Sequence, residues 1–213
     1  ILQEEALFNK IVHQRRGGFC YELNGLFAWL LRQLGFQVTL LSAGVSNAAG
    51  VFGPEFDHMT LLIHQLSGAD WLADVGFGDS FRLPLRFEAD LEQEERDGRA
   101  YRLQRQPAAG DRRGKWDRWI LQQLNDAQWE SQYCFTLQPH EMADFTAMCS
   151  YQQTSPASHF TQKRICSLAT PAGRISLSDL RLIFTTDHER REQALANEEE
   201  YIATLVQYFG IVL

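Results

Sequence analysis

The chain has 213 residues, of which 45% are hydrophobic and 22% are charged. This composition is sufficient to bury a core in one domain or two small ones, and it excludes an intrinsically disordered or collagen-like chain. The 20 Lys and Arg residues against 27 Asp and Glu residues give a formal net charge of −7. An acidic balance of this size argues against nucleic acid or an anionic membrane as the main partner.

The cysteines and the apolar runs indicate the compartment. The four cysteines show neither a CxxC pair nor a zinc-ligand spacing, so we expect free thiols in a reducing compartment and no metal site. No apolar run approaches the roughly 20 residues that span a bilayer, and no leader peptide opens the chain. We therefore expect a soluble, cytoplasmic protein. Residue 1 is isoleucine and lies inside a helical pattern, which predicts that the natural sequence starts earlier.

The predicted elements run from helices to strands and back to a helix. Apolar side chains at helical spacing predict helices over residues 2–14 and 23–34; the first pattern does not continue past the Gly17-Gly18 pair, and the second ends at Gly35. Residues 88–118 are rich in mixed charge and are expected to form exposed edge strands and a loop. Short strands are predicted over 38–41, 58–64, 71–75, 119–124, 133–137, 174–177 and 181–184, and a closing helix over 194–209. This order is typical of an α+β fold.

One segment, residues 15–25, has the pattern of an activated thiol. It places Cys20 after a pair of glycines and at the start of a predicted helix. A helix N-terminus favours a thiolate over a thiol, and this is one way in which cysteine nucleophiles are activated. The alternative is that Cys20 is merely a small buried apolar residue at the start of a helix that packs in the protein core.

A thiol nucleophile needs a base, and the base needs a group that orients it. His58 and Asp74 lie on the two strands of a predicted hairpin with its turn at residues 67–70. In an antiparallel pair, the numbers of directly opposite residues have a constant sum, and the sum of 58 and 74 is even. A register that pairs residues of even sum therefore places both side chains on one face of the hairpin. If they are directly opposite, their Cβ atoms lie about 5 Å apart. A carboxylate at that distance holds one tautomer of the imidazole.

Residues 154–160, Thr-Ser-Pro-Ala-Ser-His-Phe, are dense in hydroxyl groups. They fit either a loop that faces a ligand or an ordinary capped turn with its backbone fixed by Pro156. No phosphate-binding loop, dinucleotide fingerprint, HExxH or EF-hand pattern is present in the sequence. Nucleotide hydrolysis therefore has no support.

Four segments in order, RRGGFCYELNGLF, FDHMTLLI, WLADVGFGD and TSPASHF, resemble the hallmark segments of the arylamine N-acetyltransferases. The resemblance implies an N-terminal helical bundle, here residues 1–36, that carries the nucleophile. It further implies a β-barrel-like domain over residues 37–138 with the histidine and the aspartate, and a C-terminal α/β lid over residues 139–213. The triad arrangement is that of cysteine proteases and transglutaminases.

The resemblance also implies a ping-pong reaction. Cys20 would take an acetyl group from acetyl-coenzyme A and pass it to an arylamine, arylhydrazine or arylhydroxylamine. His58 would be its base or imidazolium partner, and Asp74 would orient His58. The other site residues that the resemblance implies are Phe77 and Phe160 as pocket aromatics, Gly76 and Gly78 for close approach of coenzyme A and the acceptor, and Arg16 and Glu22 as supports of the loop before Cys20.

Other readings of the same residues stay open. An amide synthase, or another acyl transfer, would use the same triad, and a papain-like or transglutaminase-like amidase would share the nucleophile. A catalytically silent protein that binds coenzyme A or an aromatic ligand is a third reading. Only 15 residues precede Arg16, whereas members of the family carry a further helical segment there, so we expect the helical part to expose apolar faces.

Overall fold

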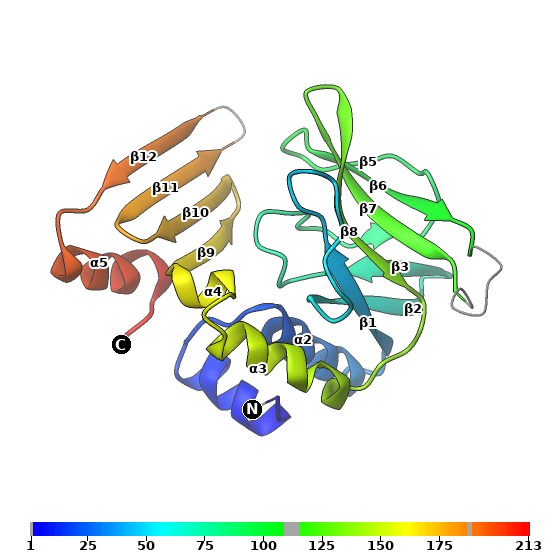
Figure 1. Cartoon of the computed structure of the whole chain (residues 1–213), viewed down its shortest axis with the longest axis horizontal. Coiled ribbons are helices and arrows are strands. Elements are labelled where there is room, and N and C mark those ends of the chain that lie inside the picture. Colours follow the sequence, from blue (N-terminus) through cyan, green and yellow to red (C-terminus); the bar gives the residue numbers. More distant parts are fainter. Residues whose placement is uncertain (1, 109–115, 187–188) are drawn as a thin grey trace.

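The computed structural model describes residues 2–108, 116–186 and 189–213 (Figure 1). Helices come first, then an antiparallel sheet, a second group of short helices, another antiparallel sheet and a closing helix, so the predicted α+β class is confirmed. The helical elements are α1 (Glu4–Phe8), η1 (Asn9–His13), α2 (Cys20–Gln33), η2 (Met142–Phe145), α3 (Thr146–Thr154), α4 (His159–Gln162), α5 (Glu198–Thr204) and η3 (Leu205–Phe209). The strands are β1 (Gln37–Val45), β2 (His58–Leu66), β3 (Ala69–Ala73), β4 (Leu85–Arg86), β5 (Gln93–Glu94), β6 (Ala100–Gln106), β7 (Arg118–Asn125), β8 (Gln128–Thr136), β9 (Ile165–Thr170), β10 (Gly173–Ser178), β11 (Arg181–Thr186) and β12 (Arg190–Ala194).

The first sheet has eight antiparallel strands in the order β4-β3-β2-β1-β8-β7-β6-β5 and curls into a barrel-like shape (Figure 1). Its two edge strands, β4 and β5, meet through one side chain. The backbone N–H of Arg86 donates to Gln93 Oε1 over 2.7 Å, and Gln93 Nε2 donates to the Arg86 carbonyl oxygen over 3.1 Å. The Gln93 amide thus takes the place of the backbone hydrogen bonds that a neighbouring strand would make with Arg86 in a fully closed barrel.

Strand β2 is buried on both faces because it separates two cores. Its residue Leu62 points into the barrel with side chains from six other strands, whereas Leu61 and Ile63 point toward the helices. The barrel core contains Leu41, Ala43, Leu62, Leu72, Phe81, Leu85, Tyr101, Leu103, Trp119, Leu121, Tyr133 and Phe135. The second core contains Cys20, Tyr21, Ala28, Leu31, Leu40, Met59, Leu61, Ile63, Ala73, Phe145 and Cys149. The strand that begins at His58 therefore lies between the barrel interior and α2.

The rest of the chain returns to the helices and then forms the second sheet. Phe145, at the end of η2, and Cys149 of α3 belong to the same core as Tyr21 of α2. The four strands β12-β11-β10-β9 form a separate antiparallel sheet. Leu177 and Leu182 of that sheet pack with Tyr201 of α5 in a third core, and Figure 1 shows this unit beside the barrel.

Several predicted boundaries differ from the structure. The first helix is α1 continued by π-helical η1; it ends at His13, close to the predicted end at residue 14, but begins two residues later than predicted. Residues 88–118 are predicted to form exposed edge strands, and for β6 this prediction is wrong. Strand β6 pairs on both sides, with β5 and β7, and its residues Tyr101 and Leu103 are buried. Part of the loop predicted there, residues 109–115, lies outside the described residues. The closing helix starts only after Asn197, whose side chain accepts from the Glu200 backbone N–H.

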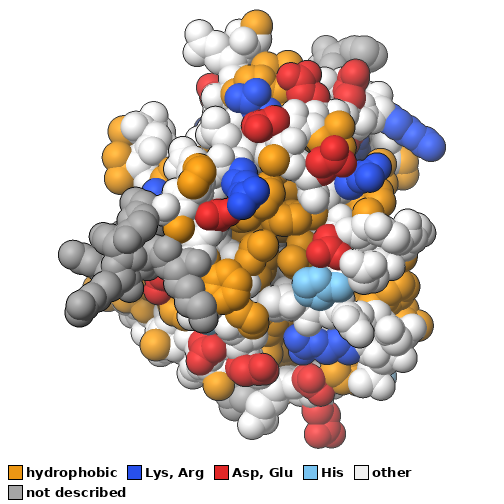
Figure 2. All heavy atoms as spheres, turned by 90° about the vertical axis from the view of Figure 1, so that its right-hand side faces the viewer, with side chains coloured by type: hydrophobic (Ala, Val, Ile, Leu, Met, Phe, Trp, Pro, Cys, Tyr) orange, Lys and Arg blue, Asp and Glu red, His pale blue; other side chains and the backbone are white. Residues whose placement is uncertain are grey.

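The surface has two apolar features. Figure 2 shows the barrel side of the molecule, where hydrophobic side chains gather near the centre with charged side chains around them. A second feature is an apolar groove between α1–η1 and α2, lined by Phe8, Ile11, Val12, Leu23, Leu26, Phe27, Trp29 and Leu30. Within the described residues no helix is long and apolar enough to cross a membrane.

Candidate active site

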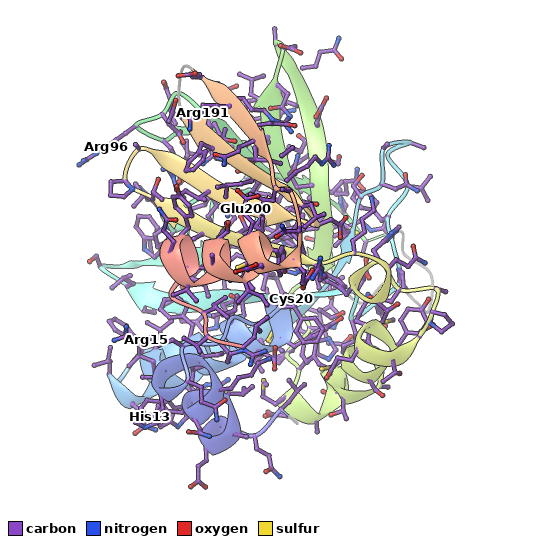
Figure 3. All side chains as sticks on the ribbon, turned by 90° about the vertical axis from the view of Figure 1, so that its left-hand side faces the viewer. His13, Arg15, Cys20, Arg96, Arg191 and Glu200 are labelled. Carbon is purple, nitrogen blue, oxygen red and sulfur yellow. The ribbon has the colours of Figure 1, made fainter. Side chains whose placement is uncertain are left out.

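Cys20 is the first residue of α2 and only 5% of it is exposed (Figure 3). Phe19 before it is extended, and its backbone N–H donates to Glu22 Oε2 over 3.3 Å. The carboxylate of Glu22 also pairs with Lys10, with Nζ at 2.7 Å from Oε1. The first turn of α2 is therefore held by a carboxylate that caps it and is itself neutralised from η1.

The two predicted supports of this loop lie in different surroundings. Glu22 is in the first turn of α2, whereas Arg16 is exposed and its side chain bonds to no residue that the structure describes. Only the Arg16 backbone N–H is fixed here, by the Lys10 carbonyl oxygen at 2.9 Å. Sequence reasoning missed Lys10, since nothing in the first helical pattern distinguishes it from a solvated lysine.

His58 and Asp74 form a buried pair. His58 Nε2 lies 2.6 Å from Asp74 Oδ2, and the two side chains are 3% and 1% exposed. The prediction that they lie directly opposite each other is wrong. Leu61 pairs with Ala73, so the same register places Asp74 opposite Thr60, two residues along the strand from His58. The predicted parity is confirmed, so both side chains still lie on the face of the hairpin that points into the barrel.

Asp74 accepts four hydrogen bonds. Its Oδ2 accepts from His58 and from the Tyr133 hydroxyl at 3.1 Å, and its Oδ1 accepts from Asn24 Nδ2 and the Gly76 backbone N–H, both at 2.9 Å. Burial alone would raise the pKa of this carboxyl group. The charge of His58 and the hydrogen bonds outweigh burial and hold the pKa of Asp74 below its usual value.

The protonation of His58 follows from the same contacts. Burial lowers the pKa of the imidazole, but the charges of Asp74 and Cys20, with hydrogen bonds to both, raise the pKa of His58 from 6.5 to about 10. Since Nε2 faces Asp74, Nδ1 is the atom available to Cys20. A protonated imidazole between a carboxylate and a thiol can stabilise a sulfur anion and return a proton to a leaving group.

Asn24 joins the helix to this pair and was missed by sequence reasoning. It is fully buried, and its Nδ2 donates to the Met59 carbonyl oxygen at 2.6 Å as well as to Asp74. Its Oδ1 accepts from the Val75 backbone N–H at 2.8 Å. The signal in the sequence was a polar residue four positions after Cys20, on the same face of α2.

The turn after Asp74 comes within contact distance of the start of α2. A Cβ added at Gly76 would lie 2.6 Å from Cys20 Cα, so only glycine fits this approach. The Phe77 ring lies with its centroid 5.0 Å from that of His58 and 4.9 Å from that of Tyr133. Gly78 has φ +85°, a conformation that favours glycine.

Phe160 contacts the residue that precedes Cys20. Its ring meets Phe19 edge-to-face with centroids 5.7 Å apart, and half of Phe160 is exposed. The loop before it is a capped turn, since Ser158 Oγ accepts from the Phe160 backbone N–H at 3.2 Å. The capped-turn prediction for residues 154–160 is thus confirmed, and the same turn presents a half-exposed aromatic ring against Phe19, the residue before Cys20.

The side chains gathered at this site are those of a nucleophile with a base and a group that orients it. Within the described ranges, no group of three or more His, Cys, Asp or Glu side chains could hold a metal ion. The described cysteines are free. The site brings together one thiol at a helix start, one imidazole and one carboxylate, with the Phe77 ring against His58 and the Phe160 ring against Phe19.

Comparisons with known proteins agree on one family. The sequence model of the N-acetyltransferase family matches residues 1–213. Arylamine N-acetyltransferase 2 of Mus musculus is 32% identical over all of this chain and 78% of its own length. The arylamine N-acetyltransferase / N-hydroxyarylamine O-acetyltransferase of Salmonella typhimurium is 34% identical over 88% of this chain and 63% of its own length.

Solved structures give the same result. The arylamine N-acetyltransferase structure from Salmonella typhimurium superposes with a TM-score of 0.89 over 99% of this chain and 74% of its own, at 30% identity. The Mycobacterium marinum enzyme, solved in complex with CoA, has a TM-score of 0.85 at 28% identity over 99% of this chain and 76% of its own. The chain belongs to the arylamine N-acetyltransferase family of acyltransferases.

Proposed function

We propose that this chain transfers the acetyl group of acetyl-coenzyme A to arylamines, arylhydrazines or arylhydroxylamines through an acetylated Cys20. The observation that carries the proposal is the buried His58–Asp74 pair beside a thiol at the start of α2. The relatives described as arylamine N-acetyltransferases, one of them solved with CoA, support the choice of donor and acceptor.

In the first half-reaction the Cys20 sulfur attacks the thioester carbonyl carbon, and the bond from that carbon to the sulfur of coenzyme A breaks. His58 gives its proton to the departing thiolate, so the products are acetyl-Cys20, a neutral imidazole and free coenzyme A. Asp74 keeps Nε2 occupied and leaves Nδ1 directed at the reacting sulfur atoms.

In the second half-reaction the neutral amine attacks the carbonyl carbon of acetyl-Cys20. The bond to the Cys20 sulfur breaks, and His58 takes the proton that the amine nitrogen loses, which restores the starting charge pair. Aromatic amines are largely uncharged near neutral pH and enter an aromatic pocket with little desolvation cost. Phe77 and Phe160 would form two of its walls.

The remaining assignments belong to the same proposal. Gly76 and Gly78 would keep the turn after Asp74 narrow for the donor and acceptor, and Glu22 would support the loop that ends at Cys20, whereas the exposed Arg16 side chain makes no bond within the described residues that could do so. Residues 1–36, 37–138 and 139–213 would act as helical part, barrel and lid. Free cysteines fit a reducing compartment, and we place the reaction in the cytoplasm.

Mass spectrometry after incubation with acetyl-coenzyme A tests the covalent step. We expect one acetyl group, located on Cys20, and none on a Cys20→Ser variant. Cys149→Ser is the matched control, since this buried thiol has its pKa raised by burial and should leave the adduct unchanged. An adduct that survives Cys20→Ser refutes the assignment.

The acceptor is tested by following the decay of acetyl-Cys20. An arylamine should remove the acetyl group much faster than water does. Faster hydrolysis than amine transfer would favour an amidase, and transfer only to an amine within the acyl chain itself would favour an amide synthase. A Cys20 that reacts with neither acetyl-coenzyme A nor iodoacetamide would favour a binding protein.

A further inference from the structure

Gln152 is a buried polar residue of α3 that the reaction described above does not use. It is 7% exposed and lies two residues before the end of that helix, Thr154. Its amide is bonded at both ends: Nε2 donates to Asp57 Oδ1 over 3.0 Å, and Oε1 accepts from Ser158 Oγ at 2.6 Å. Asp57 and Ser158 are 101 positions apart in the sequence, so Gln152 links two distant segments.

Ser158, at one end of this link, is bonded to the residue that carries the half-exposed Phe160 ring. Ser158 is 2% exposed, and its Oγ also accepts from the Phe160 backbone N–H. The ring of Phe160 then packs edge-to-face on Phe19, the residue before Cys20. The hydrogen bonds of Gln152 therefore fix the base of the turn from which Phe160 projects.

Asp57, at the other end, adjoins the strand that carries His58 and is bonded to α2. Asp57 immediately precedes His58, and its carbonyl oxygen accepts from the Tyr21 hydroxyl at 3.1 Å. Tyr21 follows Cys20 in α2 and is fully buried. Gln152 is thus bonded on one side to a segment that is anchored to the thiol and imidazole strands, and on the other to the turn that carries Phe160.

We propose that Gln152 is a positioning residue for the acceptor: it holds the Phe160 turn at a fixed place beside Cys20 and so sets how well an aromatic acceptor binds. The inference rests on the proposed function, because Phe160 matters in this way only if an aromatic amine enters the site. It predicts a role in the second half-reaction and little in the first.

The amide group is required at this position because it supplies one donor and one acceptor. Leucine in its place would leave Asp57 Oδ1 without this donor in a buried site, and Ser158 Oγ would keep only its second acceptor, the backbone carbonyl oxygen of residue 152 at 3.0 Å. Glutamate would direct a second carboxylate at Asp57. Gln153 offers a matched control, since it is the exposed neighbour on the same helix and its amide bonds only to Cys149, one turn away.

The experiment measures the two half-reactions separately in wild type, Gln152→Leu and Gln153→Leu. Coenzyme A release without acceptor reports acetylation of Cys20, and decay of the acetyl-enzyme with aniline or with hydrazine reports acceptor use. For Gln152→Leu we expect kcat/KM for aniline to fall about tenfold, as for a lost buried hydrogen bond. Acetylation and the reaction with hydrazine, which has no ring to place against Phe160, should fall less than about threefold. Gln153→Leu should match wild type.

Two further variants keep the inference testable if Gln152→Leu folds poorly. Ser158→Ala breaks the other end of the link and should show the same selective loss with aniline. In Phe160→Ala, adding Gln152→Leu should cause no further loss for aniline, since residues acting through one another are not additive. Equal losses in both half-reactions, or equal losses for aniline and hydrazine, would overturn the inference. If wild type itself does not prefer aniline to water, the proposed function fails instead.

Discussion

The close approach of the turn after Asp74 to α2 can be tested with a single added carbon atom, Gly76→Ala. The new Cβ would lie 2.6 Å from Cys20 Cα, 3.1 Å from Cys20 Cβ and 3.0 Å from Asn24 Nδ2. Carbon atoms pack at about 3.5–4.0 Å, so the turn and the helix must separate by about 1 Å. The nearest contact is a backbone atom, which no side-chain rotation relieves.

Two consequences of that separation have different sizes. Overpacking of this kind costs about 1–3 kcal/mol of the free energy of unfolding. A displacement of about 1 Å in a catalytic arrangement can cost about 100-fold in rate, and here the displaced turn carries the Gly76 N–H that bonds to Asp74. We therefore expect acetylation of Cys20 to slow much more than the protein loses stability.

Stopped-flow release of coenzyme A and urea unfolding measure these two quantities. Gly17→Ala is the matched control, because the residue lies only three positions before Cys20 but a Cβ added there meets nothing within 4 Å. An acetylation rate for Gly76→Ala within about twofold of Gly17→Ala, in protein that unfolds normally, would refute the reasoning from close approach.

Two other predictions concern the groups that hold the buried pair. Asn24→Leu should lower the free energy of unfolding by about 1–3 kcal/mol, because the Met59 carbonyl oxygen and the Val75 N–H lose their buried partner; unchanged urea unfolding would contradict this. The pKa of His58 is raised from 6.5 to about 10 in the folded state, so its contribution to stability is complete below pH 6.5 and is lost as the pH rises through 10. The difference in unfolding free energy between wild type and His58→Gln should therefore shrink over that range, and a difference that is constant or grows with pH would be inconsistent with the raised pKa.

The parts of the site that the sequence could predict were those with a local signal. A glycine pair followed by an apolar stripe indicates a helix that begins near Cys20, and α2 begins at that residue. The alternation of β2 likewise indicates which residues share a face. Asn24 and Tyr133 could not be predicted as partners of Asp74, since they lie 50 and 59 positions from it in sequence. Asn24 meets it only when α2 packs against the sheet, and Tyr133 only when the sheet curls.

Boundaries failed where tertiary pairing overrides periodicity. Ala194 fits the helical pattern of the tail but is hydrogen-bonded in β12 opposite Arg181, and the helix begins only at the Asn197 cap. The charged composition of residues 88–118 suggested exposed strands, yet Tyr101 and Leu103 alternate with the charged residues and fill the barrel core. In both cases a partner strand distant in sequence decides the outcome.

The shared face of His58 and Asp74 depends on an irregularity that parity alone does not reveal. The turn at Ser67-Gly68 pairs Leu66 with Ala69, and this register, continued without interruption, would place the two side chains on opposite faces of the hairpin. The register shifts by one residue between Leu66 and Ile63, because two residues of β2 face only one of β3. Gln65, at the bulge, has φ +54°, and its backbone N–H is held by Asp70 Oδ1 at 2.9 Å. The bulge therefore brings the imidazole and the carboxylate to the same side, and the even sum of their numbers predicts the correct face only because the bulge is present.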